Sequence, residues 1–107
     1  MTGEGLTRHD GFRLQLKVVM VTGRLILHQY RLVSPPTADA DAIEEEARRL
    51  LHQLLSEIYS ANPLFVLNNP PVLYNREHLV SIEWDVSGPS HNIAEVRRRI
   101  AGLNIPR

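Results

Sequence analysis

The sequence predicts an α+β fold, a two-layer sandwich in which two helices pack on one face of a mostly antiparallel sheet. Two kinds of apolar pattern support this prediction. One is a helical repeat over residues 38–59, and the other is a set of short alternating segments on both sides of that repeat. In chain order the expected elements are two strands, a helix, a strand, a short further strand, a strand and a helix.

The central helix is predicted over Ala38–Tyr59. Its apolar residues recur at spacings of three and four, which places them on one face of a helix. These residues are Ile43, Ala47, Leu50, Leu51, Leu54, Leu55 and Ile58. Thr37 or Asp39 is expected to cap the first turn, and Asn62-Pro63 is expected to end the helix.

Two alternating segments, residues 12–21 and 25–33, predict a pair of strands joined by a turn at Gly23. A register in which paired residue numbers have an even sum brings both apolar sets to one face, so core burial should select it. The opposite face is polar at its open end and apolar near the turn. The apolar residues there are Val19, Val21, Leu25 and Leu27. Either the chain's own tail covers them, for example through Leu103 and Ile105, or they form an interface.

Three further segments follow the central helix. Residues 64–67 are a continuous apolar run, which predicts a strand buried on both faces, and residues 72–74 predict a brief extended segment. Residues 79–86 alternate, which predicts a half-buried strand. Its core-facing side chains are expected to be Val80, Ile82, Trp84 and Val86. The apolar spacing of residues 93–103 predicts the second helix, with a cap at Asn92.

The composition limits the possible functions. The chain has 107 residues, and we expect residues 1–11 to be a flexible tail and residues 12–107 to form a single domain. Twelve basic and twelve acidic residues give zero net charge, so no overall field attracts nucleic acid or an anionic membrane. The absence of cysteine excludes disulfides, thiolate metal sites and a cysteine nucleophile. With no secretory signal and no apolar run near the ~20 residues that span a bilayer, we expect a cytoplasmic protein.

Two histidines are candidates for chemistry, although none of the five histidines has metal-ligand spacing, and we predict neither a metal nor a cofactor. His28 lies on the apolar face of its predicted strand, and His78 shares the parity of Val80 and Trp84. The two histidines could line a pocket if their strands were neighbours. The favoured interpretation of His28 is a hydrogen-bonded core residue.

Glu83 and Asp85 are the next candidates, because carboxylates at i and i+2 of one strand lie about 7 Å apart. That separation can hold a water between a general acid and a base, but the pattern is also typical of the solvated face of a half-buried strand, which we favour. Arg97, Arg98 and Arg99 are the one basic cluster. We interpret them as solvated charges near a helix C-terminus. The alternative is contact with an anion or an acidic partner, such as Glu44, Glu45 and Glu46 of a neighbouring copy.

These patterns favour a small non-enzymatic accessory protein that self-associates or docks on a larger partner through the hairpin face. The alternative is a small-molecule-binding protein or enzyme, with a pocket between the sheet and the long helix. Its candidate residues are His28, Tyr30, His78, Glu83 and Asp85. A third hypothesis is nucleic-acid contact through Arg97–Arg99, against which the zero net charge and the angular spread of the arginines argue. The expected partner is therefore a protein or a second copy, and neither nucleic acid nor a membrane.

Overall fold

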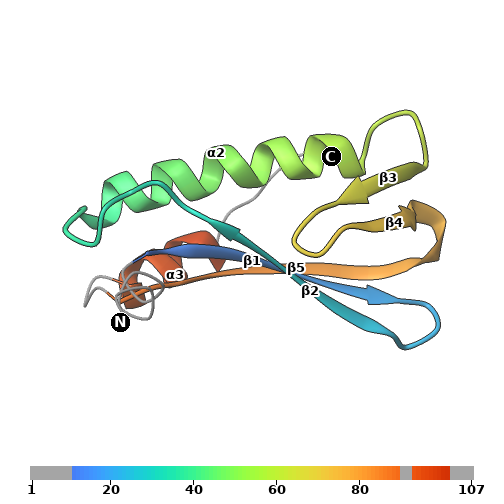
Figure 1. The fold of residues 1–107 in the computed structure, drawn as a ribbon, viewed down its shortest axis with the longest axis horizontal. Coiled ribbons are helices and arrows are strands. Elements are labelled where there is room, and N and C mark those ends of the chain that lie inside the picture. The colour runs from blue at the N-terminus through green and yellow to red at the C-terminus, as the bar shows by residue number, and fades with distance from the viewer. Residues whose placement is uncertain (1–10, 90–92, 102–107) are drawn as a thin grey trace, which may run out of the picture.

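The computed structural model describes residues 11–89 and 93–101 (Figure 1). Of the predicted tail, residues 1–11, only Gly11 falls within these ranges, and Asn92 and residues 102–107 fall outside them. The elements are β1 (Arg13–Met20), β2 (Leu25–Arg31), α2 (Ala40–Ile58), β3 (Leu64–Leu67), β4 (Val72–Asn75), the short 3₁₀ helix η1 (Arg76–His78), β5 (Leu79–Ser87) and α3 (Ile93–Ala101). Their order confirms the predicted series of strands and helices.

The strands form two antiparallel sheets, one of three strands in the order β2-β1-β5 and one of two strands, β3-β4. α2 runs along one side of the molecule, and α3 packs beside β5 (Figure 1). Side chains from both helices and both sheets meet in one core. The predicted α+β class, with both helices on one face of antiparallel sheet, is confirmed, and the strands are divided between two sheets.

Core burial selects the register of the β1–β2 hairpin. The pairs on the core face are Leu14–Tyr30, Leu16–His28 and Val18–Ile26. Each pair has the predicted even sum, and the β1 member of each pair is fully buried. A slip by one residue would turn these apolar side chains to solvent, so the observed register is the one that the core stabilises.

A β-bulge in β5 changes which of its residues face the core. Ser81 lies opposite Val19 and Leu79 lies opposite Met20, which leaves Val80 without a partner on β1. Leu79 packs against the core, and Val80 is exposed. The prediction that Val80 faces the core is therefore wrong, because the extra residue shifts the alternation at this end of the strand.

The two-stranded sheet has one buried face and one exposed face. Phe65 and Leu67 are buried, and Phe65 stacks on Tyr74 of β4 with the ring centroids 5.3 Å apart. Leu64 and Val66, which alternate with them, are exposed. The prediction of a strand buried on both faces is wrong, because β3 pairs with β4 in a sheet of two strands that packs on the core from one side.

Glu46 joins the middle of α2 to the chain that leaves β2. The helix begins after Asp39, whose carboxylate accepts a hydrogen bond from the N–H of Ala42 at 2.9 Å. Further along, Glu46 accepts from the N–H of Ser34 at 2.8 Å, from the Ser34 hydroxyl at 2.6 Å and from the N–H of Val33. These bonds satisfy main-chain donors that have left the β2 ladder and hold the β2–α2 connection against the helix.

We expect Glu46→Ala to lower the free energy of unfolding by about 1–2 kcal/mol at neutral pH, because the donors of Val33 and Ser34 lose an ionised acceptor. Burial acts to raise the pKa of Glu46, but the hydrogen bonds from Ser34 and Val33 outweigh it and hold the pKa below its ordinary value of 4.5. This contribution is therefore present above about pH 4.5 and is lost as the pH falls through the folded pKa. Urea unfolding at neutral pH and at about pH 3 measures both effects.

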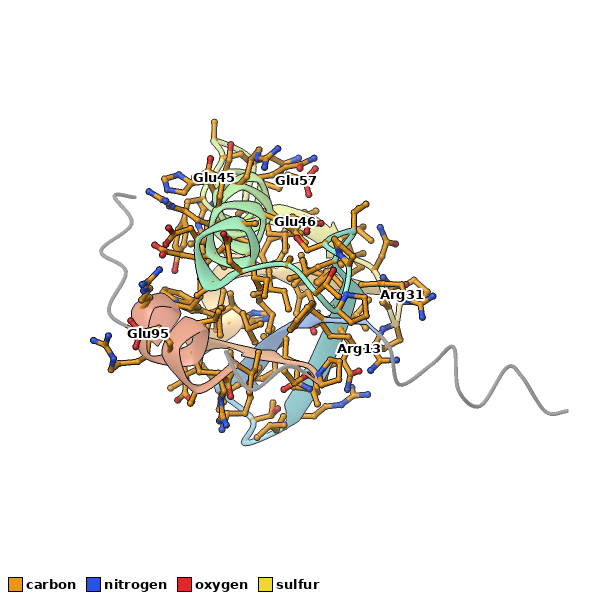
Figure 2. The ribbon with its side chains drawn as sticks, turned by 90° about the vertical axis from the view of Figure 1, so that its left-hand side faces the viewer. Arg13, Arg31, Glu45, Glu46, Glu57 and Glu95 are labelled. Carbon is orange, nitrogen blue, oxygen red and sulfur yellow. The ribbon has the colours of Figure 1, made fainter. Side chains whose placement is uncertain are left out.

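Glu45→Ala is the matched control, since Glu45 lies on the outer side of the same helix and forms an exposed ion pair with Arg48 at 3.1 Å (Figure 2). Its effect on the free energy of unfolding should stay below about 0.5 kcal/mol at both pH values. A Glu46→Ala effect that is equally large in acid would contradict the role of the ionised carboxylate.

Candidate interaction surface

An apolar patch lies on the outer face of the three-stranded sheet near the hairpin turn, and we name it the hairpin patch. Its members are Val19, Val21, Leu25, Leu27 and Val80. Val19 is half-buried opposite Leu25, and the other four expose between 41% and 63% of their surface. The sequence predicts four of the five, but it misses Val80, which only the bulge in β5 turns to the solvent side. In the sequence, the feature that corresponds to the bulge is the pair of adjacent apolar residues Leu79 and Val80, which interrupts the alternation of polar and apolar residues.

Hydrogen bonds fix the tip of the hairpin. The N–H of Met20 donates to the carbonyl of Arg24 at 2.8 Å, and the N–H of Gly23 donates to the carbonyl of Met20 at 2.9 Å. Gly23 has a φ of 87°, a left-handed conformation that costs other residues about 1–2 kcal/mol. The N–H of Val21 donates to the carbonyl of His78 at 2.8 Å, which fastens the tip to η1. The hairpin patch is therefore presented on a well-anchored main chain.

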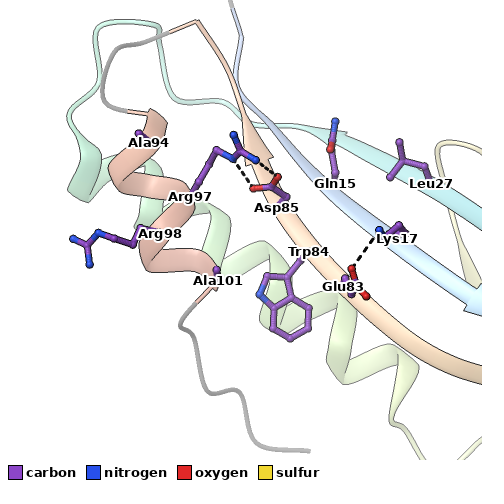
Figure 3. A pocket seen from close by; sticks show the side chains of 10 residues that line it. All are labelled: Gln15, Lys17, Leu27, Glu83, Trp84, Asp85, Ala94, Arg97, Arg98 and Ala101. Carbon is purple, nitrogen blue, oxygen red and sulfur yellow. Dashed lines mark hydrogen bonds and ion pairs between the residues drawn. The ribbon is translucent and has the colours of Figure 1, made fainter.

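A groove lies between the outer face of the sheet and α3, with a cavity volume of about 620 Å³ (Figure 3). Leu27 of the hairpin patch forms part of its wall, so the patch and the groove are continuous. The predicted carboxylates Glu83 and Asp85 line it too. The remaining lining residues are Gln15, Lys17, Trp84, Ala94, Arg97, Arg98 and Ala101.

Each carboxylate in the groove already binds a cation. The ammonium of Lys17 lies 3.4 Å from Glu83, and the guanidinium of Arg97 contacts both oxygens of Asp85 at 3.0 and 2.8 Å (Figure 3). The hydrogen bonds to Asp85 raise the pKa of Arg97 above its ordinary value. Both ion pairs are partly exposed, which is typical of structural surface pairs and not of a general acid that faces a general base.

The three arginines of the basic cluster diverge and bind acidic residues of the same chain. Arg97 points into the groove. Arg98 and Arg99 donate to the carboxylate of Glu95 and lower its pKa to about 2. Arg99 also reaches α2, where its partners are Asp41 at 2.6 Å and Glu44 at 3.1 Å. The acidic start of the long helix, considered above as a partner in another copy, therefore has an arginine partner within its own chain.

His28 is fully buried and has two hydrogen-bond partners. Its Nδ1 lies 2.9 Å from the main-chain oxygen of Asn68, which can only accept, so Nδ1 carries the proton of the neutral ring. Nε2 then accepts from the hydroxyl of Tyr74 at 2.6 Å. Burial is the main cause that raises the pKa of Tyr74 to about 12, so this hydroxyl remains a donor at neutral pH. His28 thus links β2 to the β3–β4 turn and to β4, which supports its favoured interpretation as a core residue.

The structure does not bring the two candidate histidines together. β1 lies between β2, which carries His28, and β5, which begins directly after His78. His78 is exposed in η1. Tyr30 is partly buried on the core face of β2, where burial is the main cause that raises its pKa. Of the residues considered for chemistry, Glu83 and Asp85 line the groove, whereas the two histidines and Tyr30 do not.

Within residues 11–89 and 93–101, no three metal-ligating side chains gather into a group that could hold an ion. Among the same residues, no helix combines the length and apolar character needed to cross a bilayer. The chain matches no protein-family model, no curated protein and no solved structure. The fold and the hairpin patch therefore define a small α+β protein with exposed apolar residues on its three-stranded sheet.

Proposed function

We propose that this chain is a non-enzymatic interaction subunit that docks on a protein surface through the hairpin patch. The observation that supports the proposal is the exposure of four large apolar residues near the anchored tip of the hairpin: Val21, Leu25 and Leu27 of the hairpin itself and Val80 of β5. Contiguous exposed apolar surface usually marks an association site. The zero net charge favours the same role, because long-range repulsion between two approaching chains is weak.

The polar residues offer less support for catalysis. The groove carboxylates Glu83 and Asp85 are paired with cations, and both ring nitrogens of His28 are engaged in the core. A catalytic base or nucleophile needs a free position next to a substrate. Among the described residues that line the groove, each carboxylate is paired and there is no histidine, serine or tyrosine, and so the proposal is one of binding.

A small-molecule-binding protein is the second candidate, and the groove is the observation that favours it. Its volume of about 620 Å³ lies within the ~300–1,000 Å³ that ligand pockets occupy. Trp84 supplies an aromatic wall, while Lys17, Arg97 and the two carboxylates supply both signs of charge. A native mass spectrum of the purified protein that shows a retained small molecule would favour this candidate over the first.

A photo-crosslinking residue at Leu25 tests the proposed function in cells of the natural source. We expect it to capture a protein, because Leu25 lies within the patch and its side chain reaches solvent. Leu73, a leucine of comparable exposure on the outer face of the two-stranded sheet, is the matched control position. Capture from Leu25 should be lost when Val21→Lys and Leu27→Lys are added. Equal capture from both positions, or none from Leu25, would contradict the proposal.

A further inference from the structure

We infer that the partner of the hairpin patch is a second copy of this chain, which adds its own β2 antiparallel to the free edge of β2. The inference rests on the proposed function and names the occupant of that surface. It predicts a two-fold symmetric dimer in which the two three-stranded sheets become one continuous sheet. Three observations support it: the free main-chain groups of β2, the residues beside them, and the limits of the free edge.

The first observation is the unpaired main chain of β2. In the sheet order β2-β1-β5, β2 is an edge strand, and its other side faces the β3–β4 turn. The N–H of Gln29 donates to the carbonyl of Asn69 at 3.1 Å, so the main chain of Gln29 points away from β1. Along an antiparallel strand, the main-chain N–H and C=O groups of successive residues point alternately toward one neighbour and the other. Leu25 and Leu27, which are four and two residues before Gln29, therefore also point these groups away from β1. Among the described residues, these groups of Leu25 and Leu27 have no hydrogen-bond partner.

The second observation is the absence of protective residues along this part of the edge. Soluble proteins guard exposed strand edges with charged side chains, proline or a covering loop. The run Leu25-Ile26-Leu27 carries none of these side chains, although the edge is guarded further along by the loop at Asn69. The side chains of Leu25 and Leu27 also belong to the hairpin patch, so a strand added here would continue the apolar face as well as the ladder.

The third observation is the extent of the free edge, which a second copy of the same edge matches about a two-fold axis. The edge is limited by the turn at Gly23 on one side and by the Asn69 contact on the other. A two-fold axis at Ile26 sets Leu25 opposite the partner's Leu27, and Leu27 opposite the partner's Leu25. In that register every outward N–H and C=O of both leucines finds a partner on the other copy. The four leucine side chains then lie together on one face, which is the isologous contact typical of a closed dimer.

Sedimentation velocity and native mass spectrometry of the full chain, from low to high micromolar concentration, test the inference. We expect a monomer–dimer equilibrium, and we expect Leu27→Pro to weaken it by about tenfold or more. Proline removes the outward N–H of Leu27, and strands tolerate proline where that N–H faces solvent at an edge. Leu27→Lys, which changes only an exposed side chain and leaves the ladder to β1 intact, should weaken the dimer too. Circular dichroism verifies that both variants are folded.

Leu73→Lys is the matched control, because it places the same charge on an equally apolar exposed position of the other sheet. It should leave the dimer unchanged. A wild-type chain that is monomeric at every concentration would overturn the inference, as would a dimer that survives Leu27→Pro. If the chain is monomeric and the crosslink from Leu25 captures a different protein, the proposed function stands and the second copy is the wrong occupant. If neither a dimer nor a captured protein is found, both proposals fail.

Discussion

Replacing His28 by alanine is expected to lower the free energy of unfolding by about 3–5 kcal/mol. The ring is fully buried, and its loss leaves a cavity between β2 and the two-stranded sheet that holds its partners. It also leaves the hydroxyl of Tyr74 and the carbonyl of Asn68 without the partners that they have at 2.6 and 2.9 Å. A buried polar group without a partner costs about 1–3 kcal/mol on its own. Chemical denaturation at neutral pH measures the loss.

His78→Ala is the control for His28→Ala, since His78 is exposed and its effect should lie within about 0.5 kcal/mol. Tyr74→Phe keeps the ring and removes the hydroxyl that bonds to His28. In a double-mutant cycle, the loss from Tyr74→Phe should shrink once His28 is alanine, because the bond that it breaks is already absent. Additive losses would show that the hydrogen bond between the two side chains contributes little, and a small His28→Ala effect would contradict the structural role.

Gly88→Ala is the second substitution with a large expected effect, about 2–3 kcal/mol of destabilisation. A Cβ at Gly88 would lie 2.1 Å from Cδ1 and 2.7 Å from Cε1 of Phe12, far inside contact distance. The ring of Phe12 is fully buried and belongs to the core, so it can move only by displacing other side chains. The loss should appear as a lower denaturation midpoint at an unchanged m-value.

Two further variants identify the cause of that loss. Gly11→Ala is the control, because a Cβ there meets the flexible end of Arg31, with Nε at 3.4 Å, and its effect should be small. Phe12→Leu should cost stability by itself but should make Gly88→Ala less harmful, since the smaller side chain leaves room for the methyl group. If the two losses simply add, the clash with Phe12 does not explain the effect of Gly88→Ala.

The elements with strong local signals are the ones that could be predicted from the sequence. The predicted helix Ala38–Tyr59 corresponds to Ala40–Ile58 in the structure, because its apolar stripe and the cap at Asp39 are local. The register of the hairpin was also predictable, since both of its strands have one apolar face and a slip by one residue would separate those faces.

The features that depend on distant partners could not be predicted. Nothing local distinguishes a strand buried on two sides from β3, in which Leu64 and Val66 are exposed. The bulge at Val80 is set by pairing with β1, which is distant in the sequence: Ser81 pairs with Val19 and Leu79 pairs with Met20, so Val80 between them has no partner. For the same reason, four members of the hairpin patch follow from the alternation of the hairpin, whereas Val80 and the groove beside α3 needed the folded chain.

Trp84 gives this protein a built-in optical probe. Its indole N–H donates to the carbonyl of Ile100 at 3.0 Å, so the ring is tied to the last turn of α3 while it also lines the groove. The chain contains one tryptophan, and its fluorescence therefore originates from this one place. A change in emission wavelength would signal either the detachment of α3 or the entry of a molecule into the groove, with no dye attached to the protein.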